Sequence, residues 1–160
     1  MLFSFLAGVL LSCQKNSAPN ATVGTPAQTS NNIAYGTDAL QKLDVFLPAN
    51  RTDSTTKSII LIHGGAWSSG DKSDFGSFTD SIKNRLPGYA VFNINYRLSA
   101  GGTTNLFPTQ ENDVKAAVEF IYSKRNDYKI SDKFVLLGAS AGAHLALLQA
   151  YKYSSPVNIK

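Results

Sequence analysis

Apolar residues gather in short runs, separated by longer segments in which apolar and polar residues are mixed. Four runs have the length of strands and predict strands at 43–47, 58–62, 89–95 and 133–137, with another near 33–35. The longer segments predict helices at 74–85, 109–126 and 141–151. Because strands and helices alternate, we expect an α/β fold with a doubly wound, mostly parallel sheet.

The last predicted strand runs directly into the sequence Gly-Ala-Ser-Ala-Gly at residues 138–142. Strand, sharp turn and helix are the setting in which G-x-S-x-G forms a nucleophile elbow. The tight turn requires small residues at Gly138 and Gly142, and it lifts the hydroxyl of Ser140 away from the backbone. The helix that follows favours negative charge near Ser140. A glycine-rich turn with a capping serine is the alternative that this pattern leaves open.

A second motif, His-Gly-Gly-Ala-Trp at residues 63–67, follows the predicted strand 58–62. Two glycines at the end of a central strand let backbone N–H groups turn toward an open site. Acyl transfer needs such donors for the oxyanion of its tetrahedral intermediate. We expect the amides of Gly65 and Ala66, together with the amide of Ala141, to form this oxyanion hole. A plain strand-to-helix turn is the alternative.

With both motifs at strand ends in this order, the chain resembles the α/β-hydrolase superfamily. The resemblance is to its carboxylesterase/lipase branch with an HGG-type oxyanion loop, which includes acetyl-xylan and feruloyl esterase-like members. It covers residues 35–151 and rests on these segments: 35–36, 43–48, 63–72, 95–98 and 113–118. The chain departs from many members at Ala66, where they carry a third glycine. The methyl group of Ala66 leaves its N–H in place.

This resemblance implies hydrolysis of carboxylic esters by Ser140 through an acyl-enzyme, with no metal and no cofactor. It also implies supporting roles in the loop and the elbow for His63, Gly64, Gly138 and Gly142. Trp67 either lines the substrate pocket or packs between the loop and a helix. Arg97 is expected to brace nearby loops by donating to backbone carbonyls.

A serine hydroxyl needs a general base, and in this superfamily an acid and then a histidine follow the nucleophile. Residues 141–160 contain no Asp or Glu, and their one histidine is His144. Since His144 lies among small and apolar residues, we expect it to be a hydrogen-bonded core histidine. The family position of the acid cannot be assigned to Asp113. We therefore expect the fold to be incomplete at its C-terminus, and the 160-residue chain to be inactive alone.

The N-terminal residues 2–11 form an apolar run that is too short to span a bilayer and matches the core of a secretory signal. The run ends at Leu-Leu-Ser-Cys, which resembles a bacterial lipoprotein cleavage box, and Cys13 is the sole cysteine. We expect a signal peptide at 1–12, a lipid-anchored disordered tether at 13–32 and the hydrolase domain at 33–160. Cys13 would hold the protein at the membrane of a bacterial cell envelope, on its periplasmic or outer face. An ordinary signal peptide and secretion are the alternative.

The net charge of +4 comes from 15 basic and 11 acidic residues, and the basic residues are scattered. This distribution argues against a nucleic-acid interface. Two other functions remain open from the sequence. One is a catalytically inactive, surface-anchored binding module on the same fold, and the other is a serine peptidase or amidase on the same scaffold.

Overall fold

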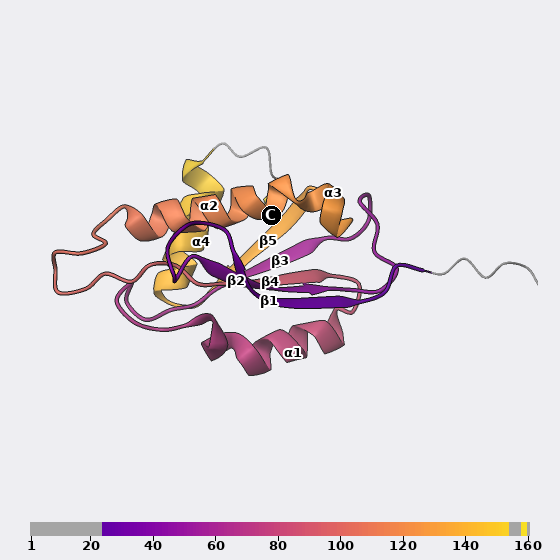
Figure 1. The fold of residues 1–160 in the computed structure, drawn as a ribbon, viewed down its shortest axis with the longest axis horizontal. Helices are drawn as coiled ribbons and strands as arrows, with labels where there is room; N and C mark the ends of the chain where they lie inside the picture. Colours follow the sequence, from indigo (N-terminus) through magenta and orange to yellow (C-terminus); the bar gives the residue numbers. More distant parts are fainter. Residues whose placement is uncertain (1–23, 154–157, 160) are drawn as a thin grey trace, which may run out of the picture.

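A central sheet with helices on both faces organises the protein (Figure 1). The computed structural model describes residues 24–153 and 158–159. Its strands are β1 (Gln28–Ala34), β2 (Lys42–Leu47), β3 (Ser58–Ile62), β4 (Ala90–Ile94), β5 (Lys133–Gly138) and β6 (Asn158–Ile159). Its helices are the 3₁₀ helix η1 (Lys72–Phe75) and the α-helices α1 (Gly76–Arg85), α2 (Thr109–Ser123), α3 (Arg125–Tyr128) and α4 (Ala141–Lys152).

The strands lie in the order β1-β2-β4-β3-β5-β6. β3 pairs in parallel with β4 on one side and β5 on the other, and β5 pairs in parallel with β6. β2 is antiparallel to both β1 and β4. The predicted doubly wound α/β fold is therefore confirmed, and the strand predicted at 58–62 has the bounds of β3.

Each face of the sheet has its own hydrophobic core. α2, α3 and α4 cover one face and α1 covers the other (Figure 1). Ile60 and Ile62 pack in the core on the α2 and α4 side, whereas Ile59 and Leu61 pack in the cluster that contains Ile82 of α1. The side chains of successive β3 residues therefore pack on opposite faces of the sheet. Because both faces are covered, all five positions are buried, and the strand is mostly apolar in sequence.

Most boundaries lie within two residues of the sequence predictions, and two regions differ by more. The predicted disordered tether at 13–32 overlaps β1, whose Gln28 pairs with Leu47 of β2. This edge strand is mostly exposed, so its polar residues carried no hydrophobic signal. The helix predicted at 109–126 is divided, because α2 ends at Ser123 and α3 follows and ends at Tyr128, before a left-handed Lys129 with a φ of 52°.

The predicted signal peptide, Cys13 and the first part of the tether lie outside the described residues. In the part of the chain that is described, no helix is both long and apolar enough to cross a membrane.

Candidate active site

Three loops leave the sheet at the same level, at the carboxyl ends of three neighbouring parallel strands. Ile62 at the end of β3 pairs with Ile94 of β4 on one side and Gly138 of β5 on the other. The loop after β3 (residues 63–71, here called the HGG loop), the elbow after β5 (138–142) and the segment after β4 (95–99) therefore start side by side. Such a crevice is where ligands bind in open α/β sheets.

Ser140 stands at the corner between β5 and α4 with its side chain exposed. Its φ of 51° and ψ of −117° are a conformation that L-residues with a Cβ rarely adopt. Its side chain makes no capping hydrogen bond to α4, so the alternative of a capping serine does not describe this turn. Strained backbone of this kind is typical of functional sites.

Close backbone packing explains the two glycines of the elbow. A methyl group on Gly138 would overlap the backbone of Gly142, and one on Gly142 would overlap the carbonyl oxygens of Ile62 and His63. The Gly142 N–H donates to the carbonyl of Ala139 at 2.9 Å, which closes the turn. The elbow thus holds the first turn of α4 directly against the end of β3.

The HGG loop packs against this elbow through Gly64. A Cβ on Gly64 would lie 2.9 Å from the Ala139 carbonyl oxygen and 3.4 Å from the Cβ of Ser140. The next three residues, 65–67, have positive φ angles of 106°, 49° and 62°. In this conformation the amides of Gly65 and Ala66 donate to no acceptor among the described residues. The amide of Ala141, the first residue of α4, has no partner within its helix.

His63 lies beneath the HGG loop and does not face solvent. Its side chain is buried, its Nδ1 lies 2.7 Å from the Gly64 carbonyl oxygen, and its ring stacks on Tyr96 at a centroid separation of 4.2 Å. Burial lowers the pKa of His63, which keeps the imidazole neutral. The hydroxyl of Tyr96 donates to the carbonyls of His63 and Gly64, at 3.0 and 3.2 Å. These contacts give His63 a structural place under the loop.

His144 is not the buried core histidine expected from the sequence. Its side chain is exposed on α4, and its ring meets Trp67 edge to face at 5.5 Å. The helix buries its other face, which carries Leu145, Ala146 and Gln149, so the apolar context of His144 belongs to its neighbours. No hydrogen bond joins His63 or His144 to the Ser140 hydroxyl among the described residues.

A pocket of about 390 Å³ opens between the HGG loop, α2 and α4. Trp67, 39 % exposed, lines this pocket together with Ala66, and it also packs against His144 of α4, so both sequence interpretations of Trp67 remain open. The other lining residues are both apolar and polar: Ser68, Ser99, Phe107, Gln110, Glu111, His144, Leu145 and Leu148. Glu111 is buried, and hydrogen bonds from Lys152 and Tyr153 lower the pKa of its carboxyl group.

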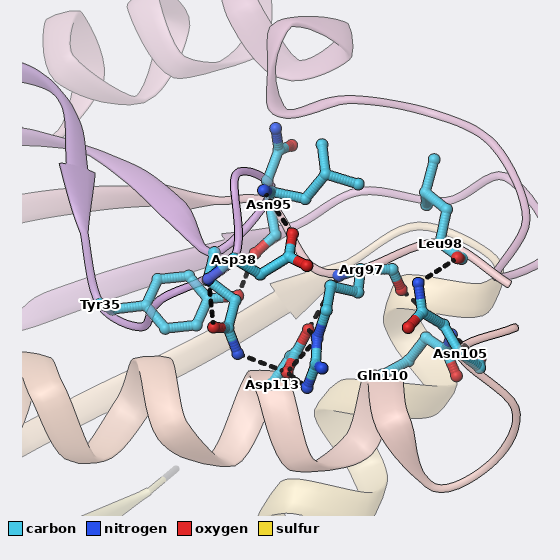
Figure 2. Close-up of polar contacts among 10 residues, drawn as sticks. Tyr35, Asp38, Asn95, Arg97, Leu98, Asn105, Gln110 and Asp113 are labelled. Carbon is cyan, nitrogen blue, oxygen red and sulfur yellow. Dashed lines mark hydrogen bonds and ion pairs between the residues drawn. The ribbon is translucent and has the colours of Figure 1, made fainter.

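Asp113 forms a buried polar cluster that the sequence did not indicate (Figure 2). Its carboxylate accepts from the backbone N–H, Nε and Nη2 of Arg97 and from the side chain of Gln41. Arg97 therefore braces its loop through a carboxylate, and not through the backbone carbonyls that we expected. Sixteen residues separate Arg97 from Asp113, and no local sequence pattern predicts their pairing.

Comparisons with known proteins identify a family and similar structures. Residues 43–157 match the BD-FAE family. The chain is 36% identical over 120 residues to the kynurenine formamidase of Meyerozyma guilliermondii, a match that covers 74% of this chain and 42% of that protein. Esterase B from Lactobacillus rhamnosis has a similar structure, with a TM-score of 0.65 and 29% identity over 79% of this chain and 40% of its own. A truncated carbohydrate esterase from gut microbiota gives a TM-score of 0.61 and 27% identity over 76% of this chain and 42% of its own.

The chain spans less than half the length of the curated relatives that it matches. No group of three or more His, Cys, Asp or Glu residues in the described part of the chain is arranged to hold a metal ion. The family match extends from β2 through the HGG loop, the elbow and α4, and so includes the whole of the crevice described above. The chain belongs to the BD-FAE family, within the α/β-hydrolase esterases.

Proposed function

We propose that this chain carries the nucleophile and the oxyanion hole of a serine hydrolase that acts on carboxylic esters. The proposal is carried by an exposed, uncapped Ser140 that lies across the Gly64 contact from two amides, those of Gly65 and Ala66, which donate to no acceptor in the described part of the chain. A turn that only connects two elements requires neither a strained serine nor backbone donors without acceptors. Both features cost free energy, and both are typical of a site that stabilises an oxyanion.

In the proposed reaction the Ser140 hydroxyl attacks the ester carbonyl and passes its proton to a general base. The amides of Gly65, Ala66 and Ala141 stabilise the negative charge on the carbonyl oxygen. The tetrahedral intermediate collapses, the alcohol leaves with a proton, and an acyl group remains on Ser140. Water then releases the acid and restores the serine.

The general base and its acid come, in this proposal, from a part of a longer protein. His63 is enclosed under the loop, and no Asp or Glu follows Ser140 in the sequence. The relatives are more than twice as long as the aligned part of this chain, which leaves room for both residues. We propose an acyl group on a carbohydrate as one substrate class, since a carbohydrate esterase is among the structural neighbours.

The proposed function is tested by covalent labelling together with a measurement of ester hydrolysis. The longest protein that carries this chain should hydrolyse p-nitrophenyl acetate and react with a fluorophosphonate probe at Ser140. Ser140→Ala should lose both activities, whereas the matched surface variant Ser123→Ala, at the far end of α2, should keep both. Retention of hydrolysis and labelling by Ser140→Ala would overturn the assignment of the nucleophile.

Amide hydrolysis is a second candidate, favoured by the 36% identity to a kynurenine formamidase. The same protein should then cleave N-formyl anilides with a kcat/KM at least equal to that for phenyl esters. Preference for the ester would support the esterase, and preference for the formamide would support the amidase. Absence of turnover with either, together with ligand binding, would favour the inactive binding module.

We also propose that Cys13 is the lipidated N-terminus of the mature protein in a bacterial envelope. The support is the short apolar run before the sole cysteine and the polar segment after it. The wild type made in a bacterial host should partition into detergent and yield an acylated N-terminal peptide by mass spectrometry. Cys13→Ser should remain in the aqueous phase, and equal partitioning of both proteins would contradict the anchor.

A further inference from the structure

The segment at residues 95–99, which continues β4 beyond the sheet, lies between helix α2 and the HGG loop. It contacts the loop at its beginning, middle and end. The Tyr96 hydroxyl donates to the carbonyls of His63 and Gly64, and the Ser99 N–H donates to the Trp67 carbonyl at 2.8 Å. The Asn95 side chain donates to Asp71 at 2.6 Å. This segment therefore supports the loop at three points along its length.

Helix α2 holds the same segment from the other side (Figure 2). Asp113 accepts from the Arg97 N–H at 2.9 Å, and Gln110, one turn earlier on α2, donates to the Arg97 carbonyl at 3.0 Å. Gln110 also donates to the Asn105 carbonyl at 2.8 Å, which ties down the loop that follows. Both backbone groups of Arg97 are therefore fixed by side chains of α2.

The Asp113 carboxylate is well satisfied and well enclosed. Its side chain is 1% exposed, it forms a two-point pair with the Arg97 guanidinium, and it accepts from Gln41 at 2.8 Å. A carboxylate that is buried in this way holds its partners in one geometry, because any other arrangement leaves a charge unpaired. Asp113 thus fixes Arg97 in position and, through it, the whole segment.

The strained backbone at Ala66 and Trp67 needs support from its surroundings. Both residues have a Cβ and a positive φ, a strained conformation that persists only where the surroundings impose it. Their loop has few backbone hydrogen bonds of its own, from the amides of Ser68 and Ser69 to the Gly65 carbonyl. The contacts from residues 95–99 therefore supply much of the constraint on the direction of the free N–H groups.

We propose that Asp113 is a positioning residue, which acts through Arg97 and the segment 95–99 to hold the HGG loop with its amides aimed at the reacting carbonyl. This inference rests on the proposed function for its effect on turnover. Asp113 is buried, and its hydrogen-bond partners in the described part of the chain are Arg97 and Gln41, so it acts on the loop indirectly. Its loss should impair stabilisation of the transition state and leave binding of the ground state almost unchanged.

The test combines kinetics with amide hydrogen exchange in Asp113→Asn. In the longest protein that carries this chain, kcat for p-nitrophenyl acetate should fall about tenfold with KM within about twofold. Exchange of the amides at 63–72 should be about tenfold faster than in the wild type. Arg97→Lys, which keeps the charge but loses the planar fork, should behave in the same way, and the double variant should lose no more than either single one.

Ile121→Ala is the matched control for a general loss of stability. Ile121 is buried on the same helix, two turns beyond Asp113, and belongs to the hydrophobic core. It should lower the melting temperature while leaving kcat and loop exchange unchanged. Unchanged loop exchange in Asp113→Asn, or changes no larger than those of Ile121→Ala at equal stability, would overturn the positioning role. Absence of wild-type turnover would instead count against the proposed function, and hydrogen exchange would still decide the role of Asp113.

Discussion

Replacement of Tyr96 by Phe removes one oxygen atom from beneath the HGG loop and little else. The Tyr96 side chain is 1% exposed, and its ring stacks on His63 with an interplanar angle of 9°. Phe keeps this stacking and the buried apolar area. The variant therefore isolates the two hydrogen bonds from the hydroxyl to the carbonyls of His63 and Gly64.

The loss of stability in Tyr96→Phe depends on which hydrogen-bond donors the two carbonyls keep. The Gly64 carbonyl keeps its contact with His63 Nδ1 at 2.7 Å, whereas the His63 carbonyl loses the donor that Tyr96 supplied. A buried acceptor left without a donor costs about 1–3 kcal/mol, and we expect about 1.5 kcal/mol here. Over about 130 described residues, an unfolding entropy of about 2 cal/mol/K per residue converts this into a fall of about 5 °C in Tm.

Thermal unfolding followed by circular dichroism measures this shift in the chain itself and needs no activity. Tyr128→Phe is the matched control, because the Tyr128 side chain is half-buried and its hydroxyl makes no hydrogen bond among the described residues. We expect its Tm to stay within about 1 °C of the wild type. A Tyr96→Phe protein that melts with the control would refute the argument that this hydroxyl supports the loop.

Three further predictions concern the elbow and the start of η1. The free energy of unfolding, measured in urea, should be about 1 kcal/mol higher for Ser140→Gly than for Ser140→Ala, because glycine adopts a φ of 51° without strain. Equal stabilities would contradict a strained corner. Gly142→Ala should cost about 1–3 kcal/mol by forcing its methyl group onto the carbonyls at the end of β3, while Gly88→Ala, whose methyl group meets nothing within 4 Å, should be nearly neutral in the same assay. Partial burial opposes ionisation of Asp71, yet hydrogen bonds from the Ser73 amide and the Asn95 side chain lower its pKa from 3.8 to about 2. Asp71→Asn should therefore cost about 1 kcal/mol above pH 4, after allowance for solvent screening, and progressively less as the pH falls toward 2. A cost that is independent of pH would argue against an ionised Asp71 held by these hydrogen bonds.

Positions whose environment is set locally were predictable from the sequence. The strand at 58–62 is flanked by strands on both sides and buried on both faces, so its apolar run marks both of its ends. The elbow was predictable for a related reason, since Gly138 and Gly142 are required by contacts within a few residues of Ser140 and with the end of β3. The family match confirms the interpretation of fold that these two motifs suggested.

Features that depend on distant partners were not predictable in this way. β1 is polar and exposed, and only its pairing with β2 makes it a strand. His144 shares a sequence neighbourhood with buried residues but faces outward, because a helix of 12 residues has two faces and the histidine lies on the open one. The pairing of Arg97 with Asp113 joins the end of one strand to a later helix, and neither residue alone indicates the other.

The backbone at Ser140 limits which side chains this corner could accept in its place. Residues branched at Cβ are strongly disfavoured at positive φ, so threonine would strain the turn although it carries the same hydroxyl group. Cysteine shares the unbranched shape of serine and would fit. Of the three small residues with a hydroxyl or a thiol, the geometry of the chain therefore admits two. The corner therefore accepts the exchange of a hydroxyl for a thiol, whereas it does not accept the addition of a single methyl group.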